Sequence, residues 1–168
     1  LRAVLALHLR QLGFRPYVSS EPGFPAPPNM PPYAGCLEVL DTCVASIAVI
    51  DQRYGQAFDD WGPYTKSYRG LSPTHAEIRH ALALRRPLWV YVRQAVYSDY
   101  DSWRDNPVAY KALKHKRRPD DRTLELISEL KNHQPAPWIE PLLDVTVIMN
   151  SLTKRFMEQL ARSFSSGS

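Results

Sequence analysis

Apolar residues recur every three to four positions in several segments of the chain, which is the spacing of one helix face. The first such segment runs from Leu1 to Leu12, and Gly13 is expected to end its helix. Further helices are predicted over residues 35–45, after Pro73, and over residues 106–116, 120–133 and 142–161. The last of these shows an apolar stripe at Leu142, Val145, Met149, Leu152, Phe156 and Leu160.

Two shorter runs, Ser46–Asp51 and Pro87–Val92, are apolar at successive positions and rich in β-branched or aromatic residues. This pattern predicts strands that are covered on both faces. Phe14–Val18 is a further strand candidate, in which Pro16 favours an edge position, and Trp138–Glu140 is another. The proline-rich segment 21–33 is expected to form a long loop.

Helices and strands therefore alternate along the chain, which indicates an α/β fold with a parallel sheet between two layers of helices. The 168 residues suit one domain, expected over residues 1–162, with a flexible tail at 163–168. The chain opens inside a helix, whereas a doubly wound, flavodoxin-like sheet starts with a central strand. We therefore expect that the first central strand precedes Leu1 and that this chain is a fragment.

Composition supports a globular chain, with 44% hydrophobic and 23% charged residues. The formal net charge is +4, and much of it lies in Lys114–Arg118. This run could bind phosphate or nucleic acid, or it could be the solvated end of a helix. No second basic cluster accompanies it, so the helix-end interpretation is preferred.

The two cysteines, Cys36 and Cys43, lie about two helical turns apart, too far for a disulfide within one helix. We expect reduced core residues and a cytoplasmic protein. The sequence shows no apolar run of transmembrane length and no signal-peptide pattern.

In an open α/β sheet, ligands bind beyond the carboxyl ends of the strands. Three segments are expected there: Asp51–Gly55, Ser72–Glu77 and residues 93–103. The last segment is predicted to be a loop. Two histidines flank Glu77, but they offer too few ligands at suitable spacing for a metal site. No metal and no cofactor are therefore predicted.

Each candidate side chain has a functional and a plain structural interpretation. Arg53 could bind phosphate or carboxylate, or form a surface ion pair. Tyr54 could stack on a ring or anchor the loop, and Gly55 permits a turn with positive φ. Ser72 is expected to cap the following helix. Glu77 lies where the helix N-terminus favours an anion, so it could be a surface acid or an active-site acid.

The segments "IAVIDQRYG", "LSPTHAEIRHAL" and "RRPLWVYV" together resemble the DUF4062 family, whose members carry a similar turn, a Ser-x-Thr-x-x-Glu helix and a proline-led strand. The resemblance runs from Leu1 to about Ala161. The family's opening strand and Ser-Ser-Thr loop are absent here, the 21–33 loop differs in composition, and Gln52 stands where glycine is common.

DUF4062 domains resemble TIR domains and nucleoside 2-deoxyribosyltransferases, in which a glutamate early in the corresponding helix serves cleavage of an N-glycosidic bond. The resemblance implies that Glu77 is the catalytic residue. The accompanying substrate-binding residues are predicted to be Arg53, Tyr54, Gly55, Ser72 and His75. NAD⁺ is then a substrate, and its already cationic leaving base needs little acid assistance.

Two functional hypotheses follow. In the first, the domain is a TIR-like effector of a defence or signalling protein that hydrolyses NAD⁺ or a related nucleotide. In the second, it is a non-catalytic module that self-associates or contacts other domains of a larger NTPase-type immune protein. The first requires the Glu77 carboxylate to face a cleft shared with the Arg53–Gly55 loop. A membrane is not an expected partner. A nucleic-acid-binding domain is a distant third hypothesis.

Overall fold

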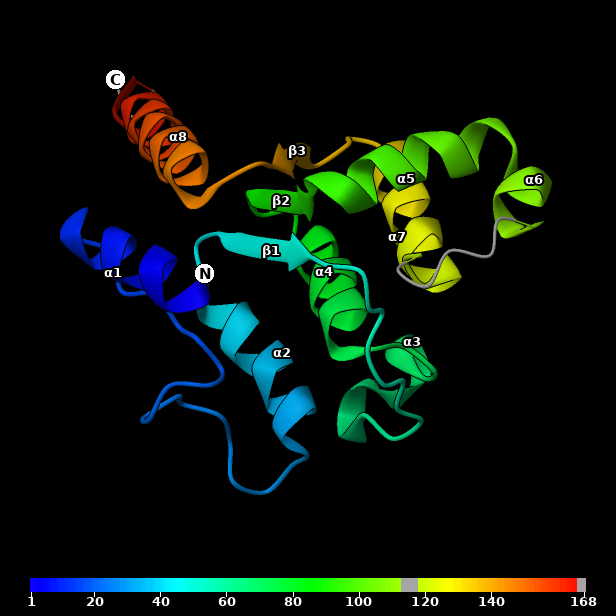
Figure 1. Cartoon of the computed structure of the whole chain (residues 1–168). Helices are drawn as coiled ribbons and strands as arrows, with labels where there is room; N and C mark the ends of the chain where they lie inside the picture. Colours follow the sequence, from blue (N-terminus) through cyan, green and yellow to red (C-terminus); the bar gives the residue numbers. More distant parts are fainter. Residues whose placement is uncertain (113–117, 166–168) are drawn as a thin grey trace. The chain divides into compact units, whose positions relative to one another are not determined.

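The computed structural model describes residues 1–112 and 118–165 of the chain (Figure 1). Lys114–Arg117, which form most of the basic run, lie outside the described residues, as does the end of the expected tail. The chain divides into two compact units. One consists of Leu1–Phe24 with Leu142–Ser168, and the other is the continuous segment Pro25–Pro141.

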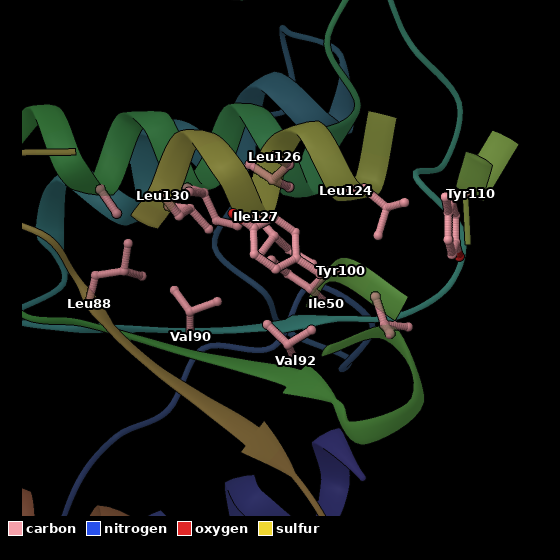
Figure 2. Packing of buried hydrophobic residues seen from close by; sticks show 13 residues of the cluster. Ile50, Leu88, Val90, Val92, Tyr100, Tyr110, Leu124, Leu126, Ile127 and Leu130 are labelled. Atoms are coloured by element: carbon pink, nitrogen blue, oxygen red, sulfur yellow. The ribbon is translucent and has the colours of Figure 1, made fainter. Parts of the chain in front are cut away.

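The sheet has three strands in the order β1-β2-β3, which are β1 (Ser46–Ile50), β2 (Leu88–Arg93) and β3 (Trp138–Leu142). β1 and β2 pair in parallel, from Ser46 opposite Leu88 to Ile50 opposite Val92. The arrows of β2 and β3 run in the same direction in Figure 2. This parallel sheet with flanking helices confirms the predicted flavodoxin-like α/β fold.

The helices of the larger unit are α2 (Pro32–Thr42), α3 (Thr65–Tyr68), α4 (Pro73–Ala83), α5 (Gln94–Asp105), α6 (Pro107–Ala112) and α7 (Asp121–Asn132), with a short 3₁₀ turn at Gly62–Tyr64. Ser72 caps α4, because its Oγ accepts a hydrogen bond from the His75 backbone N–H, and Pro73 fills the first helical position. Asp120 caps α7 by accepting from the backbone N–H of Arg122.

The main core lies between the sheet and helices α4, α5 and α7 (Figure 2). Alternate residues of β2, namely Leu88, Val90 and Val92, point to this side of the sheet, as the two-residue period of a strand requires. Every residue of β2 from Leu88 to Val92 is buried, as predicted for a covered strand. In β1 only Ile50 is buried, so β1 is less covered than its sequence suggests.

A second cluster of buried residues surrounds the start of α4 and contains Ala34, Leu37, Trp61, Tyr68 and Ala76. The Tyr33 ring stacks on Phe58, with ring centroids 4.1 Å apart, and meets the Trp61 ring edge-on. These aromatic contacts fix the long connection between β1 and α4 against α2.

The smaller unit contains α1 (Arg2–Gln11) and α8 (Val145–Ser165). His8 links the two helices, because its Nε2 lies 3.1 Å from the Met149 carbonyl oxygen and 2.9 Å from the Thr153 hydroxyl. The rings of Phe14 and Phe156 also lie against each other, with centroids 4.2 Å apart.

Some predicted elements were wrong. Phe14–Val18 forms no strand: Pro16 lacks an N–H for a ladder, and Phe14 packs on Phe156 instead. Residues 94–105 form helix α5 rather than a loop, because Val96 and Tyr100 recur at helical spacing and are both buried.

Several boundaries also differ from the sequence prediction: the helix predicted over residues 35–45 is α2, Pro32–Thr42, and the last helix ends at Ser165. Leu142 belongs to β3, and the last helix begins at Val145. Asp144 explains this start, because its carboxylate accepts from the backbone N–H groups of Thr146 and Val147. Among the residues described, no helix has the length and apolar character needed to cross a membrane.

Candidate functional site

The loop after β1 returns to the start of α4 and brings Tyr54 beside it. The backbone N–H of Phe58 donates to the Leu71 carbonyl at 3.0 Å, and that of Gly70 donates to the Phe58 carbonyl at 2.7 Å, which closes the loop. Gly55 adopts φ +88°, a conformation that favours glycine. This geometry confirms the turn expected at Gly55 and places the buried Tyr54 ring against Ser72 and His75.

A chain of hydrogen bonds runs from the loop through α4 to α7. The Tyr54 hydroxyl lies 2.6 Å from Nδ1 of His75. Nε2 of the same ring lies 3.1 Å from Oε2 of Glu129. Arg79, one turn after His75, binds both carboxylate oxygens of Glu129, at 2.7 Å each. The Tyr54–His75–Glu129 series is called the relay below.

The charges around His75 determine its tautomer. Burial lowers the pKa of His75 below its ordinary value, and this effect outweighs the attraction of the Glu129 carboxylate. Burial alone would raise the pKa of Glu129, but the hydrogen bonds from Arg79 and His75 and the charge of Arg79 together lower it. At neutral pH a neutral His75 therefore faces an ionised Glu129, so Nε2 carries the proton and Nδ1 accepts from Tyr54.

Arg122, at the start of α7, completes the surroundings of Tyr54. Its guanidinium lies over the Tyr54 ring, 4.0 Å from the centroid, in a cation–π contact. One guanidinium nitrogen, Nη2, donates to the Tyr54 hydroxyl at 3.3 Å and to the Gly70 carbonyl at 2.5 Å. The loop, α4 and α7 are thus joined by polar contacts at this point.

These groups border a cleft of about 230 Å³, which also exposes a further carboxylate. Its lining residues are Tyr54, Leu71, His75, Arg79, Arg122, Glu125 and Glu129. Glu125 is exposed and makes no hydrogen bond or ion pair within the described part of the chain. It lies three residues after Arg122, so the two project from the same side of α7. The cleft therefore offers a cation and an unengaged carboxylate side by side.

The structure brings together some of the residues that the sequence predicts and separates others. Tyr54 and His75 line the cleft, and Ser72 and Gly55 support them. Arg53 is exposed and does not line the cleft. Glu77 also lies outside the lining, because it is two residues from His75 and so projects from the opposite face of α4.

Glu77 instead lies close to Cys36 of α2. Burial, followed by the neighbouring Glu77 carboxylate, raises the pKa of the Cys36 thiol to about 11. Both cysteines are free thiols, as expected from their spacing.

The sequence prediction lacks Leu71 and four charged cleft residues, Arg79, Arg122, Glu125 and Glu129. A signal for three of them is present in α7, where positions 122, 125 and 129 share one face. That face is polar, while the buried face carries Leu124, Ile127 and Leu130. Nothing in the sequence indicates that this polar face meets the start of α4.

A second tyrosine–histidine–carboxylate series lies elsewhere on α4. The Tyr68 hydroxyl is 2.9 Å from Nδ1 of His80, and Nε2 of His80 is 2.8 Å from Oδ1 of Asp41. These residues join α3, α4 and α2, and none of them lines the cleft. His80 is therefore a buried structural histidine rather than a surface polar residue.

Comparison with family models identifies the chain. The model described as "Domain of unknown function (DUF4062)" matches residues 1–136. The chain belongs to the DUF4062 family. Neither the curated proteins nor the solved structures gave a match. The cleft of this DUF4062 domain lies entirely within the matched residues, so it is built from the part of the chain that defines the family.

Proposed function

We propose that this DUF4062 domain is a TIR-like effector domain of a defence or signalling protein, which binds NAD⁺ or a related nucleotide in the cleft and hydrolyses its N-glycosidic bond. The observation that carries the proposal is the Glu125 carboxylate, which has no hydrogen bond or ion pair with the residues that the structure describes, beside Arg122 in a cleft next to the β1 loop. The resemblance to TIR domains supplies the reaction class.

The side chains of the cleft suit the parts of a nucleotide. The Arg122 guanidinium can bind a phosphate group through paired N–H donors. The Glu125 carboxylate can accept hydrogen bonds from ribose hydroxyls, or stabilise the positive charge that develops on the sugar as the bond to the base breaks. The nicotinamide of NAD⁺ leaves as a neutral base, so no acid is required at the leaving group.

The position of Glu77 bears on which carboxylate serves this chemistry. Its carboxylate lies close to the Cys36 thiol, whose pKa it raises, and Glu77 is not among the cleft-lining residues. We therefore propose Glu125 as the carboxylate that faces the sugar, while the resemblance alone supports Glu77. Arg53, exposed and next to Tyr54, is proposed as an outer phosphate contact.

A non-catalytic signalling or oligomerisation module of a larger NTPase-type protein is the second candidate. The proximity of Glu77 to Cys36 favours it, because the glutamate expected to be catalytic then lies where α4 packs on α2. In this case the partners are further copies of the domain or other domains of the same protein.

The test is incubation of the full-length, assembled protein with NAD⁺, with nicotinamide release and nucleotide binding measured separately. Glu125→Gln and Glu77→Gln are compared with Glu158→Gln, whose exposed side chain lies on α8 in the other unit. We expect Glu125→Gln to lower the rate about 100-fold and Glu158→Gln to leave it unchanged.

If Glu77→Gln loses activity and Glu125→Gln does not, Glu77 rather than Glu125 is the catalytic carboxylate. Nucleotide binding without nicotinamide release in the wild type would favour the non-catalytic module.

A further inference from the structure

We propose that Tyr54, His75 and Glu129 form a proton relay in which the Tyr54 oxygen is the general base that activates the attacking water. The inference rests on the proposed hydrolytic function and assigns the base for that reaction. It is carried by three features that coincide at one wall of the cleft: a short tyrosine–histidine hydrogen bond, a carboxylate behind the histidine, and a guanidinium over the tyrosine.

The direction of proton transfer follows from the hydrogen bonds. The two hydrogen bonds from Arg79 hold Glu129 as an anion, which can only accept hydrogen bonds. Nε2 of His75 therefore carries a proton and donates it to Glu129 in a hydrogen bond. Nδ1 of the neutral ring then has only a lone pair, so the Tyr54 hydroxyl has to donate to it. The Tyr54 proton is therefore aimed at His75 at 2.6 Å, away from the cleft, and its oxygen lone pairs are left as acceptors.

The groups around the relay stabilise the charge that the transfer creates. The imidazolium formed on His75 would be paired with Glu129, the arrangement by which a carboxylate supports the histidine of a serine–histidine–aspartate triad. Negative charge that develops on the Tyr54 oxygen during the transfer would be stabilised by the Arg122 guanidinium at 3.3 Å and by the Ser72 backbone N–H at 3.5 Å. Both contacts are long for hydrogen bonds, so the oxygen retains the capacity to accept from a water in the cleft.

The step balances as follows. A water O–H proton moves to the Tyr54 oxygen while the Tyr54 proton moves to Nδ1 of His75. The water oxygen uses its lone pair to form a bond to the anomeric carbon, and the electron pair of the carbon–nitrogen bond leaves with the base. With NAD⁺ the products are ADP-ribose and neutral nicotinamide, and the proton on His75 returns to solvent through Tyr54.

The second series on α4 provides an internal comparison. Tyr68, His80 and Asp41 repeat the same order of groups with contacts of 2.9 and 2.8 Å. They do not line the cleft, and no guanidinium lies over the Tyr68 ring in the described residues. Tyr68→Phe therefore removes an equivalent buried hydrogen bond without touching the relay, which makes it a matched control for Tyr54→Phe.

The experiment measures NAD⁺ binding, nicotinamide release and its pH profile in the full-length wild type, Tyr54→Phe and Tyr68→Phe. Phenylalanine keeps the ring under Arg122 and removes only the hydroxyl. We expect Tyr54→Phe to bind NAD⁺ with a Kd within about threefold of wild type and to release nicotinamide about 100-fold more slowly. Its rate should no longer fall as the pH is lowered and His75 becomes protonated. Tyr68→Phe should retain the wild-type rate and pH profile.

A Tyr54→Phe rate within about threefold of wild type would overturn the relay, as would a wild type that binds NAD⁺ but releases no nicotinamide. Failure of the wild type to bind any nucleotide would instead refute the proposed function on which the relay rests. Thermal melting shows whether Tyr54→Phe is folded. If it is not, Glu129→Gln replaces Tyr54→Phe and Asp41→Asn replaces Tyr68→Phe. Slow nicotinamide release in Glu129→Gln alone would then support the relay, and a rate close to wild type would overturn it.

Discussion

The Glu77 carboxylate on α4 lies close to the Cys36 thiol on α2 and raises its pKa, and Glu77 is not among the residues that line the cleft. His75, two residues earlier, lies on the opposite side of α4 and lines the cleft. One helix thus presents the glutamate singled out by sequence to a neighbouring helix, and a histidine to the candidate site. The proximity of Glu77 also affects the reactivity of the Cys36 thiol, which can be measured directly.

Glu77→Gln should make Cys36 more reactive toward alkylating reagents. Burial and the Glu77 carboxylate hold the pKa of Cys36 at about 11, so little thiolate exists at neutral pH. Removing the carboxylate charge leaves burial as the main influence and lowers this pKa. The rate at which iodoacetamide alkylates Cys36 at pH 8.5 should rise about threefold or more. Peptide mass spectrometry measures this rate.

Cys43 serves as the control in the same sample. Its pKa is raised by burial and lowered by Arg86, with no contribution from Glu77. An increase at Cys43 equal to that at Cys36 would indicate general loosening of the domain rather than loss of the specific pair.

The fold could be predicted from sequence because its signals are local. The apolar runs of β1 and β2 and the capped start of α4 each need only a few adjacent residues to be recognised. The loop predicted at residues 93–103 is instead helix α5, whose Val96 and Tyr100 follow helical spacing; the expectation of a ligand-binding loop beyond the strand conflicts with this local signal.

Only part of the candidate site could be predicted, because its contacts join distant segments. Tyr54 and His75 were proposed together since both follow from the position of a loop and a helix start beyond the strands. Their partner Glu129 lies 54 residues after His75, and no local pattern predicts that contact. Glu77 shows the complementary limit: its helix was predicted correctly, but the direction of its side chain depends on where α2 packs.

Val90→Ala should destabilise the protein by about 2 kcal/mol, through lost apolar burial and the small cavity that remains. Val90 is completely buried in β2, on the side that faces α7 (Figure 2). Urea unfolding followed by circular dichroism measures the change. Val108→Ala is the matched control, because Val108 is 82% exposed in α6 and its change should lie within about 0.5 kcal/mol of zero. Equal effects at both sites would contradict the core described above.

Ser72→Ala should cost about 1 kcal/mol of unfolding free energy, because the His75 backbone N–H loses its cap at the start of α4. Ser72→Thr should retain most of this stability, since threonine also caps. Ser102→Ala is the control: Ser102 is exposed within α5 and donates to the Ser98 carbonyl, so alanine there should be neutral or slightly stabilising. A Ser72→Ala variant as stable as wild type would show that the cap contributes nothing to α4.

The pH dependence of stability should be less steep in His75→Gln than in wild type. The pKa of His75 is lowered from 6.5 by burial, so below pH 6.5 the unfolded chain binds a proton that the folded chain does not. Stability therefore falls as the pH drops below this value, although Glu129 opposes the effect while Arg79 and Arg122 reinforce it. Glu129, with its lowered pKa, adds a separate loss only below its ordinary value of 4.5. Urea unfolding at pH 7.5 and 5.5 separates His75 from Glu129, because the interval lies above the ordinary value of Glu129, and comparison with His75→Gln isolates the contribution of His75. If wild type and His75→Gln lose the same stability between these values, His75 is not held neutral in the folded protein.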